Sequence, residues 1–146
     1  MSWLTALRDD ATEWTRGRSP WARALLLAYL AYATARHAQQ GITGDYRSWF
    51  AGVTLAFHEL GHVALAPAGE TVMLLGGSIA QLVVPIAAGA HLFLKQHDWF
   101  GVAVCGAWLS TSLFELATYI DDANRGDLPL VGLGDDVHHD WDTLLT

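Results

Sequence analysis

Residues 71–94, TVMLLGGSIAQLVVPIAAGAHLFL, are the most informative segment of the chain for its fold. They contain no Asp, Glu, Lys or Arg, and their polar side chains are limited to Gln81, His91 and a few hydroxyl groups. A helix that is apolar on every face is either embedded in lipid or fully buried in protein. Because a membrane span needs about 20 residues, the segment predicts a transmembrane helix.

Three more apolar segments, at 21–35, 50–66 and 99–120, flank this helix. The last is long enough to cross a bilayer, whereas the other two are short and need polar flanks that reach the interface. We therefore predict an all-α, polytopic membrane protein with a four-helix transmembrane bundle. Polar side chains inside the spans are costly in lipid and should face the bundle interior; they are His58, Glu59, His62, Gln81 and Glu115.

The two ends of the chain are more polar. In residues 1–20, Trp3, Leu7 and Trp14 recur at helical spacing, which fits an interfacial membrane helix or an ordinary amphipathic helix packed on the rest. Residues 121–146 contain seven Asp and several Gly and Pro, and they form an acidic tail. The predicted organisation is an amphipathic N-terminal segment, a transmembrane domain at 21–120 and this tail.

Composition excludes several classes of function. The 146 residues include 8 Lys and Arg against 15 Asp and Glu, a formal net charge of −7 without a basic cluster. Nucleic acid is therefore not an expected partner, since phosphate neutralisation needs a basic face. Cys105 is the single cysteine, which excludes a disulfide framework, a cysteine-based zinc finger and an iron–sulfur site.

Four spans would place the N-terminal segment, the 67–70 turn and the C-terminal tail on one side of the membrane. Basic residues are slightly more frequent on that side than on the other, so the positive-inside rule assigns both termini to the cytoplasm. The residues compared are Arg8, Arg16, Arg18, Arg23 and Arg125 against Arg36, Arg47 and Lys95.

The chemistry lies in His58-Glu59-Leu60-Gly61-His62. Histidines at i and i+4 share one helical face, so both imidazoles can reach a single ion. Zinc binds imidazole nitrogen and, in catalytic sites, takes three protein ligands and water. Glu59 is placed to accept a proton from that water. We therefore predict one Zn²⁺ bound by His58 and His62, with Glu59 as the catalytic base; a hydrogen-bonded buried cluster without metal is the alternative.

A third ligand is required, and the sequence leaves it open. The segments at 50–66 and 99–120 run in the same direction, with His62 four residues before the end of the first and Glu115 five before the end of the second, so both lie at similar depth. Asp122 follows Glu115 by seven residues and returns to nearly the same helical face. Either carboxylate is a candidate. His139 and Asp140 are further candidates if the tail folds toward the site, although two surface histidines in a flexible tail would explain that segment equally.

Gly76 and Gly77 allow two interpretations. Paired glycines can mark a local helix break that exposes backbone groups to a substrate, or a packing notch that lets two helices approach closely.

These features resemble the site-2 protease class (M50-type) of intramembrane zinc metalloproteases over roughly residues 50–125. The resemblance implies that His58 and His62 bind zinc and that Glu59 is catalytic. In that family a later Leu-Asp-Gly motif supplies the third ligand; here Ile120-Asp121-Asp122 occupies its place without the glycine. The chain also resembles small bacterial membrane proteins that combine the zinc motif with a terminal His-Asp-Trp, here His139, Asp140 and Trp141.

The sequence thus leads to a zinc-dependent intramembrane metalloprotease, a multi-pass protein of a bacterial or archaeal cell membrane. Its expected partners are membrane lipid and a transmembrane or membrane-associated peptide substrate, with a homo-oligomer left open. Two alternatives stand beside it: a non-catalytic zinc-binding membrane module, and a zinc hydrolase that acts on a lipid or a small amide.

Overall fold

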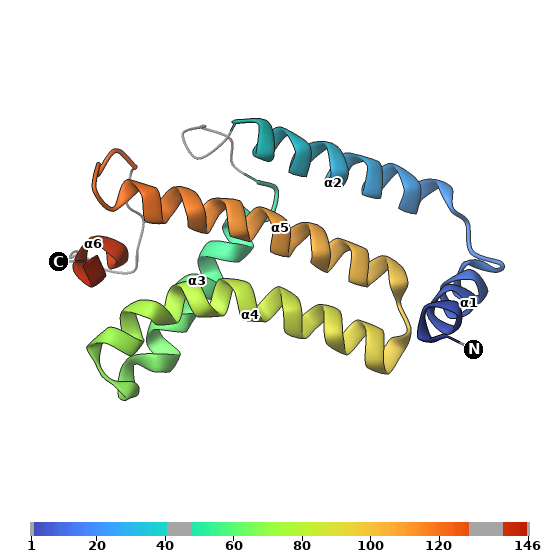
Figure 1. Ribbon diagram of the computed structural model, residues 1–146, viewed down its shortest axis with the longest axis horizontal. Coiled ribbons are helices and arrows are strands. Elements are labelled where there is room, and N and C mark those ends of the chain that lie inside the picture. The colour runs from blue at the N-terminus through green and yellow to red at the C-terminus, as the bar shows by residue number, and fades with distance from the viewer. Residues whose placement is uncertain (1, 41–47, 129–138, 146) are drawn as a thin grey trace.

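The computed structural model describes residues 2–40, 48–128 and 139–145, and it is all-α, as predicted (Figure 1). The elements in these ranges are α1 (Trp3–Thr15), α2 (Trp21–Gln40), α3 (Ala51–Leu65), the short 3₁₀ helix η2 (Ala66–Ala68), α4 (Glu70–Gln96), α5 (Trp99–Asp122) and α6 (Asp140–Leu145). The predicted apolar segments match α2 to α5 within a few residues, except that α2 continues five residues beyond position 35.

An antiparallel hairpin of α4 and α5 forms the centre of the fold (Figure 1). His97 turns the chain between them with a left-handed φ of 50°, while the amide of Asp98 donates to the carbonyl of Leu92 at 3.1 Å. Within the described residues, these two helices are long and apolar enough to cross a membrane by length and composition. The predicted set of four spans is supported for these two.

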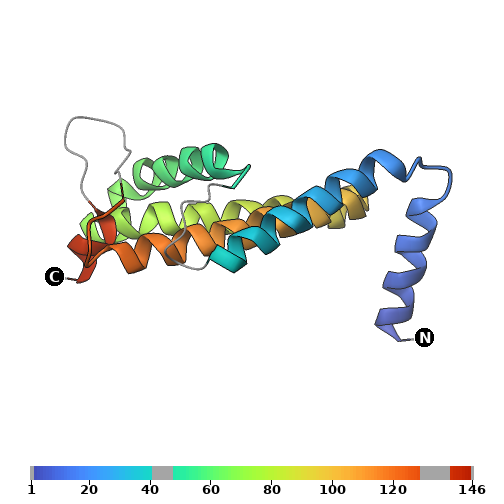
Figure 2. The same ribbon diagram turned by 90° about the horizontal axis from the view of Figure 1, so that it is seen from above.

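Helix α2 runs in the same direction as α5. The guanidinium of Arg23 lies 5.9 Å from the ring centre of Phe100 near the start of α5, and His37 stacks on Phe114 further along. Helix α1 consequently lies beside the 97–98 turn, and α6 lies at the opposite end of the hairpin (Figures 1 and 2). The prediction that the N-terminal segment shares a side with the 67–70 turn and the tail is therefore wrong.

Helix α3 packs beside only the second half of α5, which explains why the predicted side of the N-terminal segment is wrong. The hydroxyls of Thr54 and Ser112 lie 3.5 Å apart, and the rings of His58 and Tyr119 are 5.8 Å apart. The 15 residues of α3 extend about 22 Å, which is shorter than a bilayer core of about 30 Å. The chain therefore advances through α2 and α3 in one direction rather than reversing between them.

The same register corrects the depth argument for the third ligand. His58 lies beside Tyr119, so His62, one turn further along α3, lies beyond the level of Glu115. The estimate that His62 and Glu115 share a depth is wrong because α3 and α5 do not end at the same level. Helix α3 ends at Leu65 because a helix usually ends at or before the residue that precedes a proline, here Pro67.

Helices α3 and α4 approach closely at Gly61 and Gly76. A side chain on either residue would collide with the backbone of the other. Helix α4 continues through Gly76 and Gly77 without interruption. The packing-notch interpretation of these glycines is confirmed, and the interpretation as a helix break is wrong.

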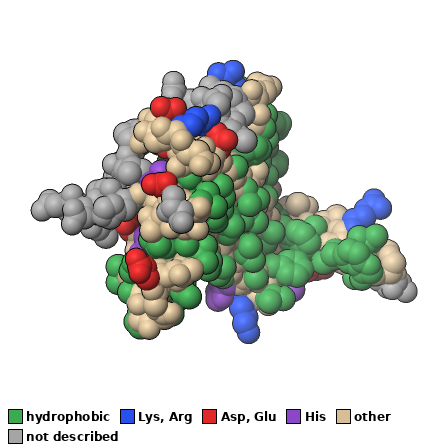
Figure 3. Space-filling model, turned by 60° about the vertical axis from the view of Figure 1, so that its left-hand side comes forward, with side chains coloured by type: hydrophobic (Ala, Val, Ile, Leu, Met, Phe, Trp, Pro, Cys, Tyr) green, Lys and Arg blue, Asp and Glu red, His purple; other side chains and the backbone are tan. Residues whose placement is uncertain are grey.

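Burial is the reverse of that in a water-soluble bundle. Large apolar side chains such as Leu25, Leu94 and Val63 are 72%, 67% and 64% exposed, whereas Ser112 and Gln81 are 0% and 5% exposed. On the face drawn in Figure 3, hydrophobic side chains form a broad surface and acidic side chains gather along one side of it. Soluble monomers rarely expose continuous apolar patches beyond a few hundred Å².

Helix α1 lies across the end of the hairpin (Figure 2). Ser2 caps its start by accepting from the amide of Thr5, and none of its residues is buried. The indole N–H of Trp99 donates to the Asp10 carboxylate at 2.8 Å, and His97 lies 3.4 Å from the same oxygen. This contact joins α1 to the turn between α4 and α5.

The Trp99 contact gives a pH-dependent prediction. The indole hydrogen bond lowers the pKa of Asp10 below its ordinary 3.8, so the contact strengthens α1 docking above that pH and is lost as pH falls through the lowered pKa. Trp99→Phe should therefore raise the Asp10 pKa toward 3.8 in a carboxyl-carbon NMR titration. Trp21→Phe is the control because Trp21 is 76% exposed. An unchanged Asp10 pKa in Trp99→Phe would contradict the assignment.

Candidate metal centre

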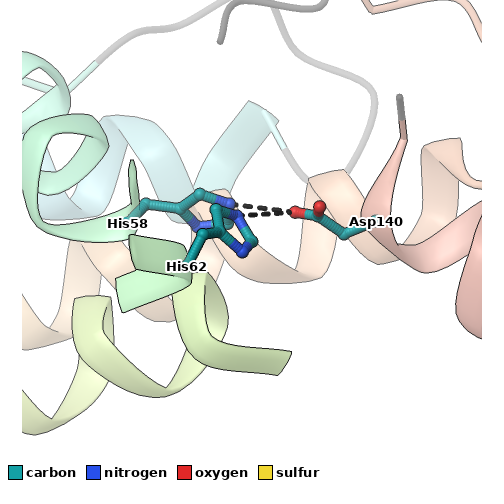
Figure 4. A group of neighbouring side chains, drawn as sticks. All are labelled: His58, His62 and Asp140. Carbon is teal, nitrogen blue, oxygen red and sulfur yellow. Dashed lines mark hydrogen bonds and ion pairs between the residues drawn. The ribbon is translucent and has the colours of Figure 1, made fainter. Parts of the chain in front are cut away.

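Two histidines from α3 and one aspartate from α6 converge on a single point (Figure 4). The Oδ2 atom of Asp140 lies 3.0 Å from Nε2 of His58 and 3.3 Å from Nε2 of His62. The rings of the two histidines are at 78° to one another, and both Nε2 atoms face the carboxylate. His58 and Asp140 are each 8% exposed, so the group is shielded from solvent.

The outer nitrogen of each ring faces a hydrogen-bond acceptor. Nδ1 of His58 lies 2.8 Å from Oε1 of Gln81, whose amide nitrogen in turn donates to the carbonyl of Ser112. Nδ1 of His62 lies 2.8 Å from the carbonyl oxygen of Met73. Because a carbonyl oxygen only accepts, Nδ1 carries the proton in both rings. In the neutral tautomer both Nε2 atoms are then bare lone pairs that face Asp140.

Two bare nitrogens and a carboxylate oxygen repel one another unless something positive lies between them. A metal ion is one answer, and a second proton on an imidazole is the other. Supporting acceptors on the outer nitrogens are typical of histidines that bind metal, because they fix the tautomer and the ring orientation. The arrangement can therefore hold a metal ion with three protein ligands.

Gly77 makes room for this convergence. A Cβ atom at position 77 would lie 2.5 Å from Nε2 of His58 and 2.6 Å from Nε2 of His62. Helix α4 therefore presents bare backbone to the two Nε2 atoms at this one turn. Residues with any side chain would occupy the space where the two rings meet.

Tyr119 and Trp141 attach α6 to the rest of the fold. The hydroxyl of Tyr119 donates to Oδ2 of Asp140 at 3.2 Å and accepts from the Asp140 amide at 3.1 Å. The indole of Trp141 donates to the Ser78 hydroxyl at 3.2 Å. These contacts determine where the Asp140 carboxylate lies relative to the histidines.

Asp122 is buried but is not grouped with the histidines. It is 1% exposed, and its two oxygens accept from the amides of Asp127 and Leu128 at 2.9 and 3.1 Å. The carboxylate thus closes the turn that follows α5. The structure places Asp122 as a support for the chain leading toward the tail.

His139 lies against α5 next to the group. Its ring stacks on Tyr119 with centroids 4.2 Å apart, and its Nε2 atom is 3.6 Å from Oδ2 of Asp122. The amide of Asp142 donates to its Nδ1 atom, so the proton of the neutral ring is on Nε2, toward Asp122. His139 is therefore adjacent to the convergence point without pointing into it.

The remaining predicted residues occupy different positions. Glu115 accepts a hydrogen bond from the Ser48 hydroxyl and is not part of the group formed by His58, His62 and Asp140. Glu59 is half-buried, and it is close enough for its charge to act on His58 and on Tyr119.

Sequence reasoning did not single out Tyr119, the Met73 carbonyl or the role of Gly77. Tyr119 had a signal, because it follows Glu115 by one helical turn and shares a face with Asp122. A backbone carbonyl has no signal in a sequence. The sequence shows the paired glycines at 76 and 77, but it does not show that histidine ring atoms lie against Gly77.

We compared the chain with protein-family models, with curated proteins and with solved structures, and none of them matches it.

Proposed function

We propose that this protein is a membrane-embedded zinc hydrolase that cleaves a peptide bond in a membrane-associated substrate. The observation that carries the proposal is the convergence of two oriented imidazole nitrogens and a carboxylate oxygen on one shielded point. His58, His62 and Asp140 would hold the metal.

The donor set and its spacing both fit zinc. Two histidines and one carboxylate are a ligand set of catalytic zinc sites, which leave the fourth position open. Donors about 2.0–2.2 Å from a tetrahedral ion are about 3.3–3.6 Å apart. The separations of 3.0 and 3.3 Å from Asp140 to the two histidines are close to that range.

Glu59 is the proposed general base, a role that zinc binding alone does not require. Zinc bound here would polarise a carbonyl and lower the pKa of water toward about 7. Glu59 would accept the proton of the attacking water and return it to the leaving amine. Tyr119 keeps the Asp140 carboxylate in place through its two hydrogen bonds.

Membrane residence is supported by the reversed distribution of polarity. The polar side chains of Gln81, Ser112 and Thr111 are buried, while apolar side chains of the long helices face outward. The most hydrophobic windows of α4 and α5 are 28% and 11% buried, unlike the core helix of a soluble protein. Polar side chains that face inward from apolar helices are typical of functional sites in membranes.

Zinc analysis of the detergent-purified protein tests the site. We expect one zinc per chain in the wild type. Asp140→Ala should lower zinc affinity by more than about 100-fold, because removing a residue that only hydrogen-bonds to a metal ligand already lowers metal affinity about 10–100-fold. Glu115→Ala is the matched control, since it removes a carboxylate from the neighbouring helix α5 and should keep wild-type zinc content. Wild-type protein without zinc after incubation with the metal, or equal loss in both variants, would contradict the proposal.

A further inference from the structure

A groove lies between α1, the start of α2 and the start of α5. These elements are at the opposite end of the molecule from α6, which carries Asp140 (Figure 2). It encloses about 320 Å³, which is within the size range of small-ligand pockets. Its walls are largely apolar and include Ala24, Leu27 and Phe100.

Two arginines line this groove, and aromatic rings hold them there. The guanidinium of Arg18 lies 4.6 Å from the ring centre of Trp14, and that of Arg23 lies 5.6 Å from the same ring and 5.9 Å from Phe100. Each also donates to a main-chain carbonyl, Arg18 to Trp14 and Arg23 to Ser19. Their side chains are thus oriented without the help of an acidic partner.

Among the described residues, neither Arg18 nor Arg23 forms an ion pair. The ion pairs of the described part of the chain involve Arg125 and histidines. The carboxylate of Asp10 on α1 contacts Trp99 and His97 rather than either arginine. Two positive charges in a chain of net charge −7 are therefore available for an anion from outside.

We propose that this groove binds an anionic phospholipid, with the phosphate between Arg18 and Arg23 and an acyl chain along Leu27 and Phe100. Guanidinium groups suit phosphate because their planar donors match its oxygens. An apolar wall next to the charges fits an acyl chain better than it fits a free anion. A headgroup that also carries a cation would be repelled by the second arginine, which favours an anionic lipid over a zwitterionic one. The inference rests on the membrane embedding proposed above and is independent of the zinc chemistry.

Native mass spectrometry of the detergent-solubilised full chain tests this site, with dioleoylphosphatidylglycerol and dioleoylphosphatidylcholine as probes. The wild type should bind the anionic lipid more tightly. The double variant Arg18→Gln/Arg23→Gln should bind this lipid about 25-fold more weakly, because each arginine near a membrane surface contributes about fivefold to the affinity for an anionic lipid. Arg8→Gln/Arg16→Gln is the matched control, because it removes the same charge from outside the groove.

Other results of this experiment would overturn the phospholipid site. Equal weakening in both double variants would overturn the site in favour of general electrostatic attraction, and equal affinity of the wild type for the two lipids would overturn the preference for an anionic headgroup. Displacement of the lipid by excess inorganic phosphate would assign the site to free phosphate and overturn the phospholipid. The helical circular dichroism and melting temperature of the arginine variants should match those of the wild type, which reports correct folding. Release of the protein from membranes by alkaline carbonate would contradict membrane embedding separately.

Discussion

Glu59→Gln should abolish peptide hydrolysis while leaving zinc binding intact. Glu59 neighbours His58 on α3 but does not belong to the convergent group, so its amide analogue would keep the proposed ligands and remove the proposed base. A positioned general base contributes about 10²–10⁴-fold to a rate, and the expected loss is of that size. Two probes are suitable: fluorescently labelled casein in micelles, and a labelled transmembrane peptide in proteoliposomes.

The control for this variant is Glu70→Gln in the first turn of α4, which removes the same charge from an exposed position. It should keep both zinc and activity. Retained turnover in Glu59→Gln with full zinc would exclude Glu59 as the base. Zinc-loaded wild type that cleaves neither probe would contradict the peptidase assignment and leave a binding module as the better description.

Gly77→Ala should prevent zinc binding without touching a ligand. The added methyl group would lie 2.5 Å from Nε2 of His58 and 2.6 Å from Nε2 of His62, in the space the ion needs. Both rings are held from behind by Gln81 and the Met73 carbonyl, so they cannot withdraw without losing those hydrogen bonds. We expect zinc content near zero and no increase in thermal stability on addition of zinc.

Gly106→Ala in α5 is the matched control, because a Cβ at that position meets nothing within 4 Å. Alanine in a helix interior is favoured over glycine by about 0.5–1 kcal/mol, so this variant should be as stable as the wild type or slightly more stable. It should bind one zinc. Normal zinc binding by Gly77→Ala would show that the ligand nitrogens do not meet where the structure places them.

The parts of this molecule that depend on local pattern could be predicted from the sequence. The bounds of α4 and α5 follow from continuous apolar residues between polar ends, and the shared face of His58 and His62 follows from helical periodicity alone. The all-α class follows from the same segments. These inferences need no knowledge of how the helices pack.

The parts that depend on packing could not be predicted in the same way. Nothing in the sequence shows that α3 starts halfway along α5. A bundle in which each span reverses the direction of the previous one therefore gives α2 the wrong direction. The related assumption that α3 and α5 end at the same level gave Glu115 the wrong depth. Asp140 was one of several open candidates because it is far from the histidines in sequence, and only the contacts of Tyr119 and Trp141 show how α6 reaches them.

The position of Asp140 on its own short helix has a consequence for control of the metal. Two donors belong to α3, while the third arrives on a separate element that is joined to the bundle through few contacts. In the proposed zinc site the third donor would therefore act as a tethered ligand, and zinc affinity would depend on the effective concentration of α6 at the histidines. A binding partner that captures α6 would then weaken zinc binding at His58 and His62 without contacting either histidine.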